Sequence, residues 1–254
     1  MLQKSRAIVL HTIRYTDDTF ISNVLTERSG VVGFMVRRAK SKKTAVKHTL
    51  FQPLTHLVLE WNAQSKGLAH PKSAQVDYAY RTLPYDHTKT GTALFLAEFL
   101  SHALRTEPPS AALFEYIESS LRWYDEASSG YANFHLTFLM RLLRLLGFRP
   151  DLGHYTDGYC FDLEAGCYCE TAPTHGNFVP PQQARLMPQL LRMNYHNMHL
   201  FKLSGSERQQ LLNVINKYYS LHVPNFPTLR SIEVLHEVYS AKQEVEKHTN
   251  AHQK

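Results

Sequence analysis

The chain has 254 residues, an apolar fraction of 43% and a net charge of +6, enough to form a packed core in one large or two smaller domains. No apolar run approaches the roughly 18–20 residues that cross a bilayer. The first residues lack the apolar stretch of a signal peptide, so we expect a cytoplasmic protein without a membrane segment. Three cysteines clustered within ten residues do not make a disulfide framework.

The positive charge is concentrated in the first third of the chain. Residues 1–80 hold twelve Lys or Arg against five Asp or Glu, whereas residues 81–254 hold sixteen against seventeen. Such asymmetry favours a nucleic acid or an anionic surface as the partner, rather than a small neutral ligand. A basic loop that is merely solvated is the simpler alternative.

The basic third of the chain also predicts a small β-barrel. Strand-like runs occupy residues 7–10, 20–26, 31–36, 54–61 and 68–71. Gly30 can take the positive φ of a tight turn between the second and third runs. Five short strands with one long loop are typical of an OB-fold, whose face and loops bind oligonucleotides.

A basic segment connects the third and fourth of these runs. It contains no acidic residue and carries six cations, Arg37, Arg38, Lys40, Lys42, Lys43 and Lys47. Flexible cations of this kind bind phosphates and lack the fixed geometry that reads bases. Arg14 and Arg28, which lie in or beside turns, are added to this predicted nucleic-acid site. Bases could stack on nearby rings, although strand aromatics are more often core: Phe20, Phe34, Phe51 and Trp61.

Beyond residue 80 the apolar period becomes that of helices. We expect helices over residues 92–105, from Ser110 as an N-cap through 121, and over 133–146, 206–221 and 228–239. A weaker helix over 180–192 would be interrupted by Pro188. The predicted fold is therefore α+β: a five-stranded OB-fold barrel over residues 1–80, then a helical domain over 81–241 with a β-hairpin insertion near 155–179. A polar tail covers residues 242–254.

The three cysteines raise the question of a metal. Cys160, Cys167 and Cys169 are flanked by His154 and His175, but structural zinc usually uses paired Cys-x₂₋₄-Cys ligands. The same segment reads as a plain hairpin with its cysteines as small buried hydrophobes. We predict no metal ligands here, and a metal-dependent hydrolase or nuclease using this cluster is the alternative function.

The apolar helix over residues 133–146 carries Arg141 and Arg144 at i, i+3 spacing. Its apolar positions are mostly core, but two arginines beside an apolar groove could hold a peptide carboxylate next to an apolar side chain. The sequence has no phosphate-binding glycine loop, nucleophile elbow or His-Glu-x-x-His motif. We therefore predict a protein that is not an enzyme and needs no cofactor, and a protein-only adaptor is a further alternative.

Seven short segments occur in a characteristic order along the chain: 7–10 (AIVL), 26–30 (TERSG), 36–43 (VRRAKSKK), 50–54 (LFQPL), 93–100 (ALFLAEFL), 132–135 (ANFH) and 145–150 (LLGFRP). Their order and spacing resemble the RecO family of bacterial recombination mediators over nearly the whole chain. The resemblance implies an OB-fold, a helical domain, binding to single- and double-stranded DNA and annealing of complementary strands. It also implies help in loading recombinase onto DNA coated by single-stranded-DNA-binding protein.

The partners implied by the resemblance are RecR and the acidic C-terminal tail of that coating protein, and the implied location is the nucleoid. Many members of the family carry a four-cysteine zinc module after the Gly-Phe-x-Pro segment. The cysteine pattern here does not match, so the chain resembles the zinc-free branch and no metal ligands are carried over. The tail-binding groove of the family lies in its helical domain, to which Arg141 and Arg144 are assigned.

Overall fold

Alternating apolar residues build a five-stranded antiparallel sheet in the computed structural model, which describes residues 1–38, 46–62 and 67–239. The strands are β1 (Leu2–Arg14), β2 (Thr19–Thr26), β3 (Gly30–Arg37), β4 (His56–Asn62) and β5 (Pro71–Tyr78), in the order β3-β2-β1-β4-β5. A parallel bridge between Phe34 of β3 and Ala69, just before β5, joins the two edges of the sheet. The predicted OB-type sheet followed by helices is confirmed.

The interior of this sheet follows the period of two that the sequence shows. Ser22, Val24 and Thr26 of β2 are all fully buried and, at a spacing of two, lie on one face of the strand. Gly30 has a φ of +65° at the β2–β3 turn, where Thr26 Oγ1 donates a hydrogen bond to the Gly30 carbonyl over 2.8 Å. The predicted hairpin turn is therefore confirmed.

The last strand differs from the prediction. The sequence predicts it over residues 68–71, but β5 begins at Pro71 and ends at Tyr78. Most of its residues are exposed or half-buried, and only Ala74 is buried, because β5 is the end strand of the ladder. A strand with one buried side chain gives little apolar alternation for a sequence pattern to detect.

Two helices follow, α1 (His87–Ala103) and α2 (Ala111–Glu126). The first begins five residues before its predicted start, because the Asp86 carboxylate accepts hydrogen bonds from the amides of Thr88 and Lys89 and caps a polar first turn. Ser110 Oγ accepts a hydrogen bond from the Leu113 amide over 3.3 Å, which confirms the predicted cap of the second helix.

Both helices belong to the same compact unit as the sheet. The chain divides into unit 1, residues 1–126, and unit 2, residues 127–254. Within unit 1, β1 contacts α1, and Ile8 of β1 is fully buried on the face opposite Val9. The predicted domain boundary at residue 80 stays a prediction.

Buried polar groups tie these helices to the sheet. Asp125 of α2 accepts hydrogen bonds from the amides of Arg81, Thr82 and Leu83 over 2.7–2.9 Å. Burial alone would raise the pKa of Asp125, but these hydrogen bonds hold it below its usual value. The segment that leaves β5 is thereby fixed to the end of α2.

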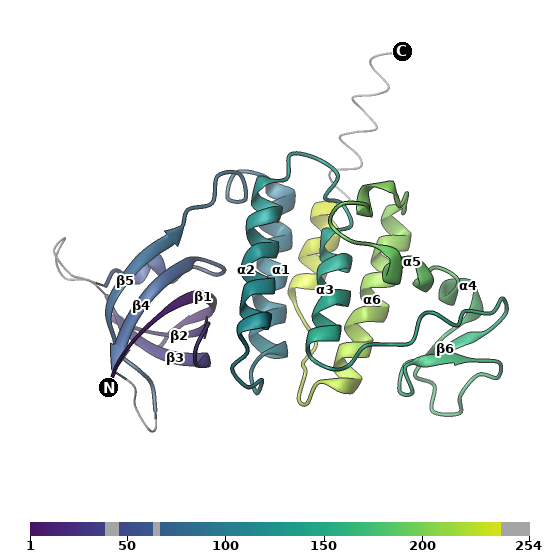
Figure 1. The fold of residues 1–254 in the computed structure, drawn as a ribbon, viewed down its shortest axis with the longest axis horizontal. Helices are drawn as coiled ribbons and strands as arrows, with labels where there is room; N and C mark the ends of the chain where they lie inside the picture. The colour runs from purple at the N-terminus through teal and green to yellow at the C-terminus, as the bar shows by residue number, and fades with distance from the viewer. Residues whose placement is uncertain (39–45, 63–66, 240–254) are drawn as a thin grey trace, which may run out of the picture. The chain divides into compact units, whose positions relative to one another are not determined.

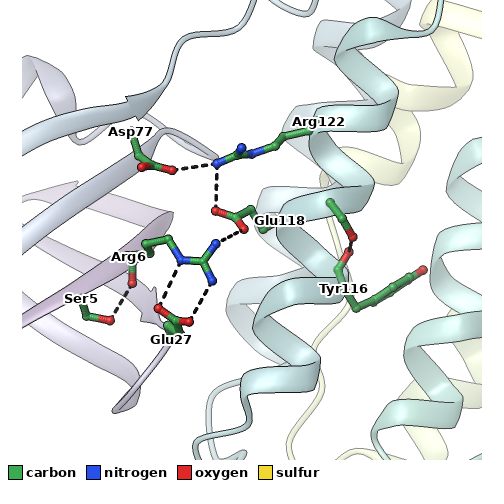
Figure 2. Close-up of polar contacts among 8 residues, drawn as sticks. Ser5, Arg6, Glu27, Asp77, Tyr116, Glu118 and Arg122 are labelled. Carbon is green, nitrogen blue, oxygen red and sulfur yellow. Dashed lines mark hydrogen bonds and ion pairs between the residues drawn. The ribbon is translucent and has the colours of Figure 1, made fainter.

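An ion-pair network also links α2 to the strands of the sheet (Figure 2). Arg6 of β1 contacts Glu118 of α2 over 2.6 Å and Glu27 of the β2–β3 turn over 2.8 Å. Arg122 of α2 contacts Asp77 of β5 over 2.7 Å. Figure 2 shows the side chains from the sheet and from α2 pointing toward one another.

Unit 2 is built around α3 (Phe134–Leu145) and α6 (Gly205–His222), which lie side by side (Figure 1). Two short helices, α4 (Pro181–Ala184) and α5 (Met187–Arg192), replace the weak helix predicted over 180–192. Pro188 lies in the first turn of α5, where its missing N–H costs little. Residues 231–239 are helical, and the predicted tail over 242–254 lies outside the described residues. None of the helices in the described ranges has the length and apolarity needed to cross a membrane.

A small sheet completes unit 2. The predicted hairpin is present as β6 (Cys160–Asp162) and β7 (Cys167–Cys169), with Gly166 at a φ of +69° in the turn. A third strand, β8 (Phe178–Val179), pairs with the other edge of β6. The sequence gives no sign of β8, since two residues cannot display a period.

Candidate nucleic-acid interface and peptide pocket

One end of the five-stranded sheet gathers exposed cations. In the strand register Arg14 of β1 is opposite Phe20 of β2, and Arg37 of β3 is opposite the neighbouring Thr19. The Arg38 amide donates a hydrogen bond to the Asp18 carbonyl in the β1–β2 loop over 2.8 Å. Arg14, Arg37 and Arg38 therefore lie at the same end, and all three are exposed.

Lys47, at the C-terminal end of the predicted basic segment, lies at the same end of the sheet as Arg14, Arg37 and Arg38. It precedes the short helix η1 (His48–Leu50), and the His48 ring stacks on Phe20 with a centroid distance of 5.0 Å and an interplanar angle of 13°. Since Phe20 pairs with Arg14, Lys47 lies beside the same cations. Lys40, Lys42 and Lys43 lie outside the described residues, but both flanks of their segment are at this end of the sheet. We call Arg14, Arg37, Arg38 and Lys47 the basic rim.

The basic rim has little internal neutralisation. Arg14 contacts Asp17 over 2.5 Å, but both side chains are largely exposed. A surface ion pair of this kind contributes at most about 1 kcal/mol. The Arg14 guanidinium can therefore exchange Asp17 for a phosphate at low cost.

Arg28 does not join the basic rim. It lies in the turn between Thr26 and Gly30, and Thr26 pairs with Ala7 at the opposite end of the β2 ladder. Its neighbour Glu27 has a pKa below the usual value, chiefly through the hydrogen bond from Arg6 and to a lesser degree through the charge of Arg28. The structure thus separates Arg28 from Arg37 by the length of β2.

Of the four aromatic residues considered for base stacking, three are buried in the core and one is half-buried. Phe34, Phe51 and Trp61 are at most 2% exposed and belong to the core of the sheet, where Phe34 and Trp61 meet edge to face. Phe20 is half-buried and lies at the basic rim with His48. Only Phe20 therefore has a ring surface near the cations on which a base could stack.

The two arginines predicted to hold a peptide line a pocket in unit 2. The pocket has a volume of about 320 Å³, and Arg141 and Arg144 enter it from the exposed face of α3. Apolar side chains from α5 and the residues after it form the opposite wall, among them Leu190, Leu191 and Tyr195. Two cations beside an apolar wall form the arrangement that a C-terminal acidic and apolar peptide requires.

Sequence reasoning missed part of this pocket. Arg149 contributes a third guanidinium from the segment just after α3. The sequence does show three closely spaced arginines at positions 141, 144 and 149, but the predicted end of the helix at Gly147 separates Arg149 from the other two. The α5 wall lies more than forty residues further along the chain, so no local pattern connects it with Arg141.

The cysteines and histidines do not converge in the described part of the chain. Cys160 lies opposite Cys169, and all three thiols are free. His154 pairs with Asp151 over 2.7 Å, and His175 with Asp162 over 3.4 Å, and no group of three potential metal ligands among the described residues includes a cysteine. Burial raises the pKa of the Cys169 thiol and disfavours the thiolate that metals bind.

Comparison with known proteins identifies the family. The family model described as "Recombination protein O N terminal" matches residues 1–79, and "Recombination protein O C terminal" matches residues 84–231. The DNA repair protein RecO of Phocaeicola vulgatus is 45% identical over 241 residues, which cover 94% of this chain and 100% of that protein. Those of Bacteroides fragilis and Porphyromonas gingivalis are 42% and 34% identical, and cover 94% and 92% of this chain and 100% and 98% of their own lengths. The chain therefore belongs to the RecO family and acts in DNA repair and recombination.

Proposed function

We propose that this chain is a non-catalytic mediator that binds DNA, anneals complementary strands and helps to load recombinase onto DNA coated by single-stranded-DNA-binding protein. The observation that carries the proposal is the basic rim, four exposed cations at one end of an OB-type sheet. Membership of the RecO family supports the same role, and such a role places the protein at the nucleoid in the cytoplasm. RecR is proposed as a partner on the family resemblance alone.

The basic rim binds the phosphate backbone without reading sequence. Each lysine or arginine that meets a phosphate releases condensed counterions, so binding weakens steeply as salt rises. Lys40, Lys42 and Lys43, which stand between Arg38 and Lys47 in the sequence, are proposed to contribute to the same binding site. The stacked Phe20 and His48 rings add a surface for an unpaired base.

Charge reversal tests this site. The variant Lys40→Glu, Lys42→Glu, Lys43→Glu should weaken binding to oligonucleotides of different sequence by similar factors. It should also reduce the slope of log affinity against log salt by about two, at roughly 0.7 for each lost contact on single strands. Fluorescence anisotropy over a salt series measures both quantities.

Arg28→Glu is the matched control, because Arg28 is an exposed cation at the opposite end of β2. It should leave the salt slope of the wild type unchanged. An unaltered slope in the triple variant, or an equal loss with Arg28→Glu, would remove the basic rim as the binding site.

The pocket on α3 is proposed to take the acidic C-terminal tail of the coating protein. Arg141, Arg144 and Arg149 supply charges for carboxylates, and the wall formed by Leu190 and Leu191 accepts an apolar terminal side chain. A site in unit 2 would let the protein hold the coating protein while unit 1 holds the DNA.

A peptide with the sequence of that tail tests the pocket. Arg141→Ala with Arg144→Ala should weaken its binding at least about tenfold, since two charge-assisted contacts are lost. Lys217→Ala, an exposed cation on α6 outside the pocket, is the matched control and should bind like the wild type. A peptide with an amidated C-terminus should also bind weakly. Equal affinity of the wild type and the double variant for both peptides would exclude the pocket.

The two alternative functions make different demands. A protein-only adaptor would lose DNA binding at about physiological salt, where nucleic-acid binding proteins keep micromolar or better affinity. A hydrolase using the Cys/His cluster requires ligands that converge, whereas His154 and His175 are paired with carboxylates. The geometry of unit 1 favours the DNA-binding mediator over both.

A further inference from the structure

His56 is a buried side chain whose polar atoms have no partner. It begins β4, is 1% exposed, and neither ring nitrogen has a hydrogen bond. The rings of Tyr78 and Tyr80 lie against it, with centroid distances of 5.7 and 5.4 Å. A buried imidazole without a hydrogen-bond partner is unfavourable, so both ring nitrogens of His56 are available to a ligand.

Two carboxylates lie next to that ring. A nitrogen of His56 and an oxygen from each of Asp77 and Glu118 all lie within 4.8 Å of one another. The three side chains come from β4, β5 and α2 respectively, all in unit 1. One imidazole and two carboxylates are ligands that zinc and neighbouring transition ions accept.

The guanidinium of Arg122 now occupies the position of a cation between these carboxylates. Its Nη2 contacts Asp77 over 2.7 Å and Glu118 over 3.1 Å (Figure 2). It satisfies the two acids but donates nothing to His56, and its own Nε is buried without a partner. Arg122 therefore pairs with the two carboxylates but leaves the ring nitrogens of His56 without a hydrogen-bond partner.

We propose that His56, Asp77 and Glu118 bind a divalent transition-metal ion of the zinc class, which displaces the Arg122 guanidinium. Tetrahedral zinc with bonds of about 2.0–2.1 Å places its ligand atoms about 3.4 Å apart, so these atoms, which lie within 4.8 Å of one another, need to approach by at most about 1.4 Å. Glu118 is already oriented, because Arg6 holds its other oxygen over 2.6 Å. Hard cations such as magnesium prefer oxygen ligands only, and the imidazole selects against them.

The bound ion would link two strands of the sheet to α2 and release Arg122 toward solvent, where its side chain is already 37% exposed. Three protein ligands leave a fourth position for water. The site is distinct from the basic rim, and neither Arg37 nor Lys47 takes part in it.

Metal binding by the full-length chain tests the proposal. After treatment with a chelator, the protein is titrated with zinc against a chromophoric competitor. The background carries Cys160→Ser, Cys167→Ser and Cys169→Ser, so that thiols cannot bind the metal. One equivalent should bind to the background, raise its Tm, and give cobalt d–d absorption without thiolate bands. His56→Gln and, separately, Asp77→Asn should each weaken zinc binding at least about tenfold.

Arg122→Ala is the discriminating variant. A structural role for Arg122 alone predicts only a lower Tm of the metal-free protein, whereas the proposed site predicts that zinc binds several-fold more tightly because the competing cation is gone. Circular dichroism of each variant confirms that it is folded. If the buried change His56→Gln prevents folding, Asp77→Asn still tests the site, because the Asp77 side chain is partly exposed. No zinc bound by the background, equal affinity in Asp77→Asn, or no tightening in Arg122→Ala would each overturn the proposal.

Discussion

At the scale of single residues, unit 2 buries a histidine that must stay neutral. His135 of α3 is 2% exposed, and its Nδ1 has no hydrogen-bond partner. Burial, and then the positive charge of Arg208, lower its pKa to about 3, from an ordinary value near 6.5. The unfolded chain therefore takes up the proton first as pH falls, and acid favours unfolding.

This sign gives a pH dependence. The contribution of His135 to stability is complete above pH 6.5 and is lost as pH falls toward 3. Between pH 6.5 and 5 the free energy of unfolding should fall by about 2 kcal/mol through this group. Urea denaturation of the wild type and of His135→Phe at both pH values measures the difference, and an identical pH dependence in the two proteins would contradict the assignment.

The contact between Arg6 and Glu118 is a second effect of single residues. The Glu118 side chain is only 9% exposed, so Arg6→Ala leaves a buried carboxylate that still contacts Arg122 over 3.1 Å. We expect a loss of about 2 kcal/mol, below the full cost of an unpaired buried charge. Glu27→Ala removes the more exposed partner of Arg6 and should cost under about 1 kcal/mol. Equal losses in chemical denaturation would show that burial of Glu118 is not what matters.

At the scale of elements, the sequence predicts those strands and helices whose burial follows a simple period. In β2 the buried Ser22, Val24 and Thr26 alternate as the pattern requires, and Gly30 marks the turn. Elements whose sequence signals are weak or depend on distant residues differ from the prediction or are absent from it. The start of α1 depends on a cap at Asp86, and β8 exists only because β6 offers a free edge.

The same contrast applies to the sites. The basic rim is largely a local feature, because Arg37, Arg38 and Lys47 are close in sequence and one strand register adds Arg14. Arg28 is equally near in sequence but at the other end of β2, which no charge pattern reveals. The pocket and the His56 site need partners from distant elements, so the sequence predicts only Arg141 and Arg144 of the pocket and no residue of the His56 site.

The extent of unit 1 leads to an expectation for fragments. Residues 1–126 retain α1 over β1 and the contacts of Asp125 and Glu118, whereas residues 1–80 leave Ile8 uncovered and Arg6 without Glu118. Fragment 1–126 should unfold cooperatively, and fragment 1–80 should bind the hydrophobic dye ANS and melt at lower temperature or without a clear transition. Comparable melting of both fragments would show that the predicted boundary at residue 80 marks an independent folding unit.

At the scale of the whole molecule, the two proposed tasks fall on two different units of the chain. Unit 1 carries the basic rim, which is the proposed DNA-binding site and would not by itself act on coated DNA. Unit 2 carries the pocket with Arg141 and Arg144, which is the proposed contact with the coating protein. Because both sites are on one chain, binding at one raises the effective concentration of the other.

Strand annealing with and without single-stranded-DNA-binding protein tests this division most directly. The variant with Lys40, Lys42 and Lys43 changed to Glu should anneal poorly in both conditions, since DNA binding is common to them. The variant with Arg141 and Arg144 changed to Ala should anneal bare strands like the wild type and fail on coated strands. Normal annealing of coated strands by the variant with Arg141 and Arg144 changed, or normal annealing of bare strands by the triple lysine variant, would contradict the account.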